Sequence, residues 1–198
     1  MVEVLAVDGD EIVVGILNPD GSHAEMSGNG TRIAAAWLMS TTGSDVARVR
    51  VGERVVAVRT VGDGLYESEL GDVEVFPPEL LAGIELIPVS VGNPHAVVLG
   101  DPGRIGELGP LLETDPRFPE RTNVQVARVD RPGEVTARVW ERGVGETSAS
   151  GTSAVAVAAA THGSGEVLVH FPGGDLRVRL EGGRAWLTGP AELQADEA

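Results

Sequence analysis

Two serine residues, Ser27 and Ser150, each stand directly before a glycine, at the start of an alanine-rich segment. The segments Gly30–Met39 and Thr152–Thr161 have high helix propensity, and serine is a preferred residue at a helix N-cap. A helix N-terminus offers unpaired backbone N–H groups and a positive dipole end, which attract a carboxylate or a phosphate. We expect both serines to cap helices that face one cleft, although an ordinary capping role is the simpler interpretation of either serine alone.

Polar residues in glycine-rich loops form a second set of candidates, and together they suit an amino acid as ligand. Asparagine offers neutral donors and acceptors, arginine can hold a carboxylate through two parallel bonds, and glutamate can meet an ammonium group. Each asparagine taken alone is more often a turn residue. The candidates are Asn18, Asn93, Asn123, Glu141 and Arg142.

Two residue types are absent, and their absence restricts the chemistry. All 15 basic residues are arginine, so the chain lacks the lysine that anchors pyridoxal phosphate as a Schiff base. It contains no cysteine, which excludes disulfides, thiolate metal sites and thiol nucleophiles. The four histidines show no metal-ligand spacing, and His95 is a structural histidine or a base. We expect neither a metal nor a cofactor.

Charge and hydropathy restrict the partners. A formal net charge of -15 and a pI near 4.5 disfavour nucleic acid and anionic membranes, which would be repelled at long range. No apolar run approaches the roughly 20 residues of a membrane span, and the first residues lack the pattern of an export signal. We expect a soluble, cytoplasmic protein with a small-molecule ligand, and the sequence leaves open whether it forms a homodimer.

Strand-like stretches rich in valine, isoleucine and leucine recur along the chain, and several are separated by glycine-bearing turns, as antiparallel hairpins require. The two alanine-rich segments lack a clean polar face, so each is expected to be a helix buried within its own sheet. The predicted fold class is α+β. The predicted strands are Val2–Val7, Glu11–Leu17, Ala47–Val51, Arg54–Thr60, Leu65–Leu70, Glu85–Val91, Ala96–Leu99, Asn123–Val129, Glu134–Trp140, Gly165–Phe171, Leu176–Leu180 and Ala185–Thr188.

The helix starts also resemble each other, because Met26–Gly30 aligns with Ala149–Ser153 around a shared Ser-Gly. This repeat predicts two pseudo-symmetric lobes, each with a buried central helix wrapped by antiparallel strands. A break near Pro77-Pro78 places the first lobe at residues 1–80 and the second at residues 81–184. Residues 185–198 are expected to return to the first lobe.

Four ordered segments of the chain resemble motifs of the diaminopimelate epimerase family. Residues 18–30 (NPDGSHAEMSGNG) match its N-x-D-G-S segment running into C-G-N-G, and residues 92–95 (GNPH) and 118–123 (FPERTN) match its next two motifs. Residues 141–152 (ERGVGETSASGT) match E-R-G-x-G-E-T-x-A-C-G. Four motifs in the family's order make chance agreement negligible, and the family fold of two lobes around central helices agrees with the predicted lobes.

The resemblance implies an isomerase that inverts one α-carbon of L,L-diaminopimelate, giving the meso form without a cofactor. It implies that Asn18, Asn93, Asn123 and Arg142 bind the distal end of the substrate, and that Glu141 meets the reacting end. The backbone N–H groups that follow the two serines would cradle the reacting carboxylate. These N–H groups belong to Gly28 and Asn29 after the first serine, and to Gly151 and Thr152 after the second.

Two departures from the family pattern bear on activity. The family uses one cysteine thiolate as base and one cysteine thiol as acid. The positions that match these two cysteines are occupied in this chain by Ser27 and Ser150. A hydroxyl is far less acidic than a thiol and needs an adjacent base, for which His95 is the candidate. The family's G-N-D-F and D-Q motifs, which come before the first matched segment, have no counterpart, so we expect a first lobe that is incomplete or completed by a partner chain.

Three hypotheses follow from these residues. The first is a diaminopimelate epimerase homologue impaired by its serines. The second is a non-catalytic module that binds amino acids or a partner and keeps only the carboxylate cradle. The third is a cysteine-free isomerase that resembles the phenazine-biosynthesis branch of the same fold and works with a carboxylate, for which Glu25 is the candidate.

Overall fold

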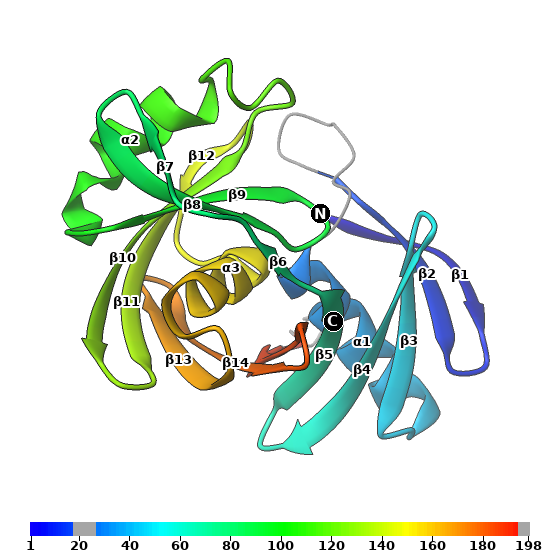
Figure 1. The fold of residues 1–198 in the computed structure, drawn as a ribbon. Helices are drawn as coiled ribbons and strands as arrows, with labels where there is room; N and C mark the ends of the chain where they lie inside the picture. The colour runs from blue at the N-terminus through cyan, green and yellow to red at the C-terminus, as the bar shows by residue number, and fades with distance from the viewer. Residues whose placement is uncertain (18–26, 194–198) are drawn as a thin grey trace. The chain divides into compact units, whose positions relative to one another are not determined.

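A computed structural model describes residues 1–17 and 27–193, drawn as a ribbon in Figure 1. Two of the candidate residues, Asn18 and Glu25, lie outside the described residues. Internal contacts divide the chain into a first unit, Met1–Glu69 with the chain from Thr188 onward, and a second unit, Leu70–Leu187. Both units combine hairpins with a helix, so the α+β fold class is confirmed. The lobe boundaries at residues 80 and 184 stay a prediction.

The first unit pairs its strands in the order β1-β2-β3-β4-β5, and helix α1 packs against β2, β3 and β4. Alternation in β2 buries Ile12, Val14 and Ile16 on one face, as the two-residue period of a strand requires. The bounds are β1 (Val2–Asp8), β2 (Glu11–Ile16), α1 (Gly28–Thr42), β3 (Val46–Val51), β4 (Arg54–Gly62) and β5 (Leu65–Asp72).

The second unit orders its strands β14-β13-β11-β10-β9-β8-β6, with β12 beside β11 and β7 beside β8. Helix α3, yellow in Figure 1, is surrounded by strands of this unit, while α2 packs on β10 and β11. Strand β15 (Arg184–Pro190) follows β14, and its residues from Thr188 belong to the first unit. The other bounds are β6 (Glu74–Val75), β7 (Glu79–Leu81), β8 (Ile84–Ser90), β9 (Pro94–Leu99), η1 (Pro102–Arg104), α2 (Ile105–Glu113), β10 (Asn123–Arg131), β11 (Glu134–Glu141), β12 (Gly145–Thr147), α3 (Gly151–His162), β13 (Gly165–Phe171) and β14 (Gly174–Glu181).

The same succession of elements occurs once in each unit. A hairpin, β1-β2 or β10-β11, leads to a helix, α1 or α3, and a second hairpin, β3-β4 or β13-β14, follows. In both units the second strand of the first hairpin, β2 or β11, pairs in parallel with the strand after the helix, and in the second unit the short strand β12 lies between β11 and α3. This order confirms the predicted pseudo-symmetric repeat.

Parallel pairing is the main difference from the predicted antiparallel pattern. Besides β2/β3 and β11/β13, strand β9 pairs in parallel with β10. A helix connects each of these pairs: α1, α3 and α2 respectively. Parallel neighbours require a long crossover connection, whereas hairpins give antiparallel pairs, so the helices account for all three exceptions.

The two central helices differ in burial. Residues Gly151–Ala159 of α3 are all buried, as predicted. Helix α1 is wrapped on one side only, because Ile33 is 43% and Trp37 39% exposed. These residues and Asn29 lie four apart on one stripe, so the prediction that α1 is buried all round is wrong for that stripe.

Helix α2 was not predicted from the sequence. It contains Gly106, Gly109 and Pro110, residues with poor intrinsic helix propensity. Burial of Ile105, Leu108 and Leu112 in one hydrophobic cluster with β9 and β10 residues stabilises it instead. Gly109 is required by space, since a Cβ there would lie 2.6 Å from Cγ of Trp140.

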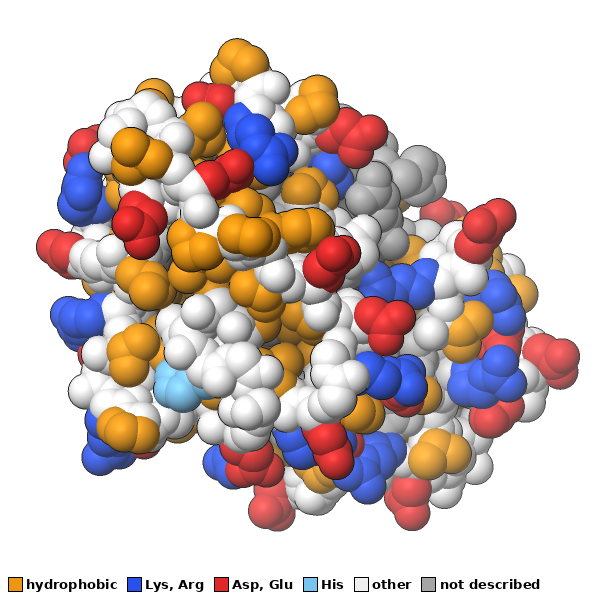
Figure 2. Space-filling model, viewed as in Figure 1, with side chains coloured by type: hydrophobic (Ala, Val, Ile, Leu, Met, Phe, Trp, Pro, Cys, Tyr) orange, Lys and Arg blue, Asp and Glu red, His pale blue; other side chains and the backbone are white. Residues whose placement is uncertain are grey.

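Surface features agree with the charge of the sequence. On the face seen in Figure 2, arginine and acidic side chains are interspersed and form no continuous basic stripe. Within residues 1–17 and 27–193, no helix is long and apolar enough to cross a membrane.

A pair of glycine substitutions tests the packing of α2 on Trp140. Gly109→Ala should lower the free energy of unfolding by about 1–3 kcal/mol, because its methyl group must displace the indole. Gly106→Ala on the same helix meets nothing within 4 Å. It should be neutral or stabilise by up to about 1 kcal/mol, through lower entropy of the unfolded chain. Urea unfolding of both variants measures the difference, and equal effects would contradict the close approach.

Candidate active site

Ser27 and Ser150 are the N-cap residues of α1 and α3, both with extended backbone. The Ser27 hydroxyl oxygen accepts a hydrogen bond from Gly30 N at 3.1 Å. Ser150 is 7% exposed, and its hydroxyl makes no capping bond. The expected caps are therefore present at both helix starts, but only one of them uses its side chain. Whether the two hydroxyls face one cleft stays a prediction.

The residues that follow the caps form the first helical turns. Three of these residues, Gly28, Gly151 and Thr152, are buried. Asn29 is exposed, and its Oδ1 accepts a hydrogen bond from Nη2 of Arg32. The first turns of α1 and α3, both within the described chain, contain no acidic residue. Neither helix therefore neutralises its positive dipole end with a carboxylate of its own first turn. The helix ends remain able to attract an external anion.

In the second unit, His95 is held on both ring nitrogens. Gln125 Nε2 lies 3.0 Å from His95 Nδ1, and His95 Nε2 lies 3.0 Å from Asn93 Oδ1. An amide nitrogen can only donate, so Nδ1 is the acceptor and the ring proton sits on Nε2. That proton is donated to Asn93 Oδ1. The NH₂ group of Asn93 is therefore not used by His95 and can donate to another group.

The histidine stays neutral. Burial lowers the pKa of His95 to about 3, and the positive charge of Arg142 adds to this shift. With both nitrogens engaged, the ring positions Asn93. The direct role as a base that the sequence suggested would require one of these hydrogen bonds to break, and it stays a prediction.

Asn123 joins two of the predicted binding loops. Its Nδ2 donates to Pro94 O and its Oδ1 accepts from the backbone N of Arg142, both at 3.0 Å. Parallel pairing of β9 and β10 sets Asn123 opposite His95, which brings the first residue of β10 to the start of β9. The segments 92–95, 121–123 and 141–142 therefore meet in one hydrogen-bonded cluster.

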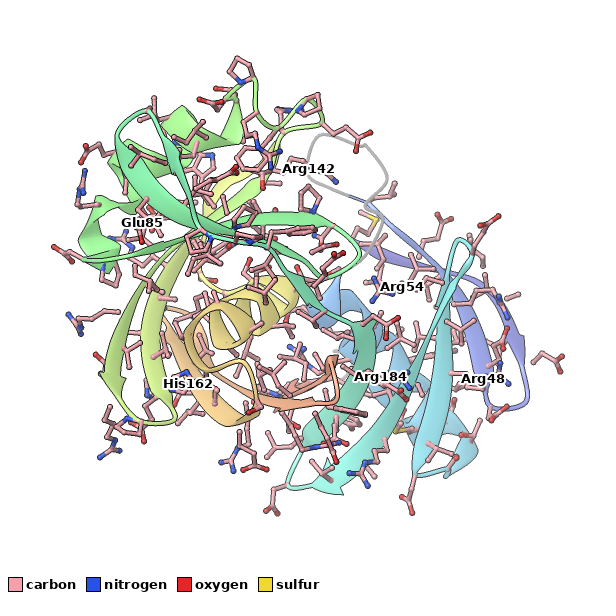
Figure 3. The ribbon with its side chains drawn as sticks, in the orientation of Figure 1. Arg48, Arg54, Glu85, Arg142, His162 and Arg184 are labelled. Carbon is pink, nitrogen blue, oxygen red and sulfur yellow. The ribbon has the colours of Figure 1, made fainter. Side chains whose placement is uncertain are left out.

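Arg142 lies on the turn between β11 and β12, where Figure 3 labels it. Its Nη1 donates to Glu120 O at 3.3 Å. The neighbouring Glu141 is half-buried and accepts from the Thr147 hydroxyl, which closes the short β11-β12 hairpin. The cluster thus presents a guanidinium, amide groups and a carboxylate, the groups expected for an amino-acid ligand.

Two residues of this region were missed by the sequence analysis. Gln125 Nε2 donates to both His95 Nδ1 and Ser153 Oγ, which links the cluster to the first turn of α3. Glu113, at the end of α2, accepts from the turn that carries Arg142. A polar residue within an apolar strand, as at Gln125, is a sequence signal that could have identified this position. No local sequence feature distinguishes Glu113. Among the described residues, no histidine and acidic side chains gather as a metal site requires.

The fold is shared with solved structures of a hydroxyproline epimerase, a probable proline racemase and phenazine biosynthesis proteins of the PhzF family. A hydroxyproline epimerase from Agrobacterium vitis, solved with trans-4-hydroxy-L-proline, superimposes with a TM-score of 0.72 at 16% identity over 96% of this chain and 71% of its own.

The family model for diaminopimelate epimerase matches residues 87–194. A diaminopimelate epimerase from Acidothermus cellulolyticus is 38% identical over 90% of this chain and 64% of its own length. One from Desulfitobacterium hafniense is 37% identical over 96% of this chain and 78% of its own length. The chain belongs to the diaminopimelate epimerase family, as the motifs predicted.

The pKa of His95 gives a test of its buried, neutral state. Unfolded His95 takes up a proton below about pH 6.5, while the folded form resists until about pH 3, so His95 costs stability as the pH falls between them. The advantage of the unaltered protein over His95→Asn should therefore shrink by up to about 1.4 kcal/mol per pH unit in that window.

Urea unfolding at several pH values between about 7.5 and 4.5 measures this difference. His170→Asn is the matched control, because its hydrogen bond to Asp175 raises the pKa of His170 and reverses the sign. Its stabilising contribution is present at low pH and is lost as the pH rises. A difference for His95→Asn that stays constant with pH would contradict the buried neutral ring.

Proposed function

We propose that this site binds diaminopimelate or a closely similar dicarboxylic amino acid, and that positions 27 and 150 carry the proton transfer that inverts its α-carbon. The observation that carries the proposal is the hydrogen-bonded cluster of Asn93, Asn123 and Arg142 in a chain of this family. The relatives named above span more sequence than this chain, so their activity enters here as a proposal.

The roles follow from the chemistry of each group. Arg142 and the asparagine amides hold the distal carboxylate and amine, for which a planar fork and neutral donors and acceptors are suited. Glu141 meets the ammonium group at the reacting carbon. The N–H groups that begin α1 and α3 hold the reacting carboxylate, where charge develops when the α-proton leaves.

Inversion needs a base on one side of the α-carbon and an acid on the other. The base takes the α-proton, the electron pair of the C–H bond is held as a carbanion beside the carboxylate, and the acid returns a proton from the opposite side. General-base efficiency requires a group whose protonation balance lies near the working pH. The hydroxyls of Ser27 and Ser150 stay protonated there, so we propose that this chain turns over slowly at most.

Such a reaction needs no cofactor, which fits a chain without lysine. A cytoplasmic location and a homodimeric state are compatible with the proposal but carry no part of it. The two serines also favour a second candidate function, a module that binds the amino acid without turnover. The two functions share the binding site and differ only in proton exchange.

Introducing two thiols separates these candidates. The Ser27→Cys/Ser150→Cys protein should exchange the α-proton of diaminopimelate at least about 100-fold faster than the unaltered protein, because helix N-termini lower thiol pKa values from about 8.5. Incorporation of α-deuterium in deuterated water, followed by NMR, measures this rate. Each single variant should do less, since inversion needs both an acid and a base.

The matched control places one thiol elsewhere on α1 and the other before the cap of α3. Ser40 lies near the end of α1 and Ser148 precedes α3, and both are exposed. Ser40→Cys/Ser148→Cys should leave exchange at the level of the unaltered protein. Exchange by the unaltered protein that His95→Asn abolishes would instead establish a serine–histidine route, and no gain in the double variant would favour the binding module.

Arg142→Lys tests the carboxylate contact. Calorimetry should show diaminopimelate bound about tenfold more weakly, because an ammonium cannot reproduce the two parallel bonds of a guanidinium. Arg128→Lys, on an exposed residue of β10 that pairs with Asp130, is the control and should not change the affinity. Equal affinities for the two variants would reject the assignment of Arg142.

A further inference from the structure

Glu113 is a buried carboxylate in the second unit that the proposed reaction does not use. It is the last residue of α2, and its side chain is 9% exposed. Its Oε2 accepts from Trp140 Nε1 at 2.7 Å, and its Oε1 accepts from Gly143 N at 2.8 Å. Arg121 Nη1 reaches the same Oε1 at 3.3 Å. Both oxygens are therefore engaged by donors from two other segments.

These donors belong to the two segments that carry the candidate binding residues. Gly143 directly follows Arg142, and Arg121 precedes Asn123 by two residues. The Glu113 carbonyl oxygen also accepts from Thr122 N at 3.3 Å. One residue of α2 thus fixes both the turn after β11 and the approach to β10.

Both contacts lie where the backbone has a positive φ, which is ordinary for glycine and strained for arginine. Arg121 has φ +60°, a left-handed conformation that is uncommon for a residue with a Cβ, and Gly143 has φ +75°. A Cβ at Gly143 would lie 3.7 Å from Nη2 of Arg121, so the two segments approach closely. Strained backbone such as that at Arg121 persists only where surrounding contacts hold it, and the Glu113 carboxylate binds the Arg121 side chain.

Two adjacent backbone N–H groups are therefore fixed by side chains from different elements. Asn123 Oδ1 accepts from Arg142 N, and Glu113 Oε1 accepts from Gly143 N. Together they set the position from which the Arg142 side chain leaves the main chain. We infer that Glu113 is a positioning residue that fixes the Arg142–Gly143 turn and thereby orients the Arg142 guanidinium for a substrate carboxylate. The inference rests on the proposed function only in giving Arg142 that role.

Glu113→Gln tests the inference because it removes one acceptor and keeps the shape. A carboxylate accepts at both oxygens, whereas glutamine offers one oxygen to two opposing donors, Trp140 Nε1 and Gly143 N. Calorimetry should show diaminopimelate bound about tenfold more weakly, and the Gly143 amide should exchange with deuterium about tenfold faster by NMR. Glu107→Gln, on an exposed glutamate of the same helix that pairs with Arg104, should change neither value.

A double-mutant cycle with Arg142→Lys separates positioning from general damage. If Glu113 acts by orienting the guanidinium, Glu113→Gln should cost little further affinity once Arg142 is lysine. A purely structural role would cost the same factor in both backgrounds, and that result would overturn the inference. An unchanged Gly143 amide in Glu113→Gln would also overturn it.

Rescue keeps the test decisive if Glu113→Gln folds poorly. Trp140→Phe removes the donor to the other oxygen, so in Glu113→Gln/Trp140→Phe the amide oxygen can take the place of Oε1 and keep the bond from Gly143 N. This double variant should bind diaminopimelate within about twofold of Trp140→Phe, and a further tenfold loss would contradict the inference. If the unaltered protein does not bind diaminopimelate at all, the proposed substrate is wrong, while the Gly143 amide still decides whether Glu113 holds the turn.

Discussion

The parallel register of β9 and β10 is the constraint on which the candidate site of the second unit depends. It sets Asn123 opposite His95, so the asparagine side chain spans from Pro94 O to the backbone of Arg142. Parallel neighbours cannot be joined by a tight turn, and the chain between them must cross over through a helix. That helix is α2, and its end delivers Glu113 to the same turn. One pairing therefore supplies both contacts that hold the Arg142–Gly143 backbone.

Burying polar side chains in the interior of this unit costs free energy, and almost all of their polar atoms form hydrogen bonds. Gln125, His95 and Asn123 lie among apolar strands, and an unsatisfied buried polar group costs about 1–3 kcal/mol. The hydrogen bonds from Gln125 to His95 and Ser153 offset most of this cost. Gln125 Oε1 remains without a partner in the described structure. A network that satisfies all but one atom fixes side-chain orientation, which an apolar core of equal stability would not do.

Local sequence patterns predicted the elements with strong periodicity and no competing tertiary demand. The hairpin strands, the two alanine-rich helices and their serine caps are of this kind. Helix α2 was missed because Gly109 and Pro110 lower its propensity, while packing against Trp140 makes Gly109 necessary. Strand pairing is not a local property, so no local pattern indicated that β9 and β10 are parallel. For the same reason the motifs identified Asn93 and Arg142, but the contacts of Glu113 and Gln125 required the fold.

The two halves of the repeat share one topology but differ in the residues at their helix starts. The difference lies three residues after each N-cap serine. In α1 this position is Gly30, whose N–H closes the cap on Ser27 and where a Cβ would lie 3.1 Å from Cδ1 of Ile16. In α3 it is Ser153, whose hydroxyl accepts from Gln125 and so connects to His95. The start of α1 is therefore closed on itself, whereas the start of α3 is coupled through Gln125 and His95 to Asn93.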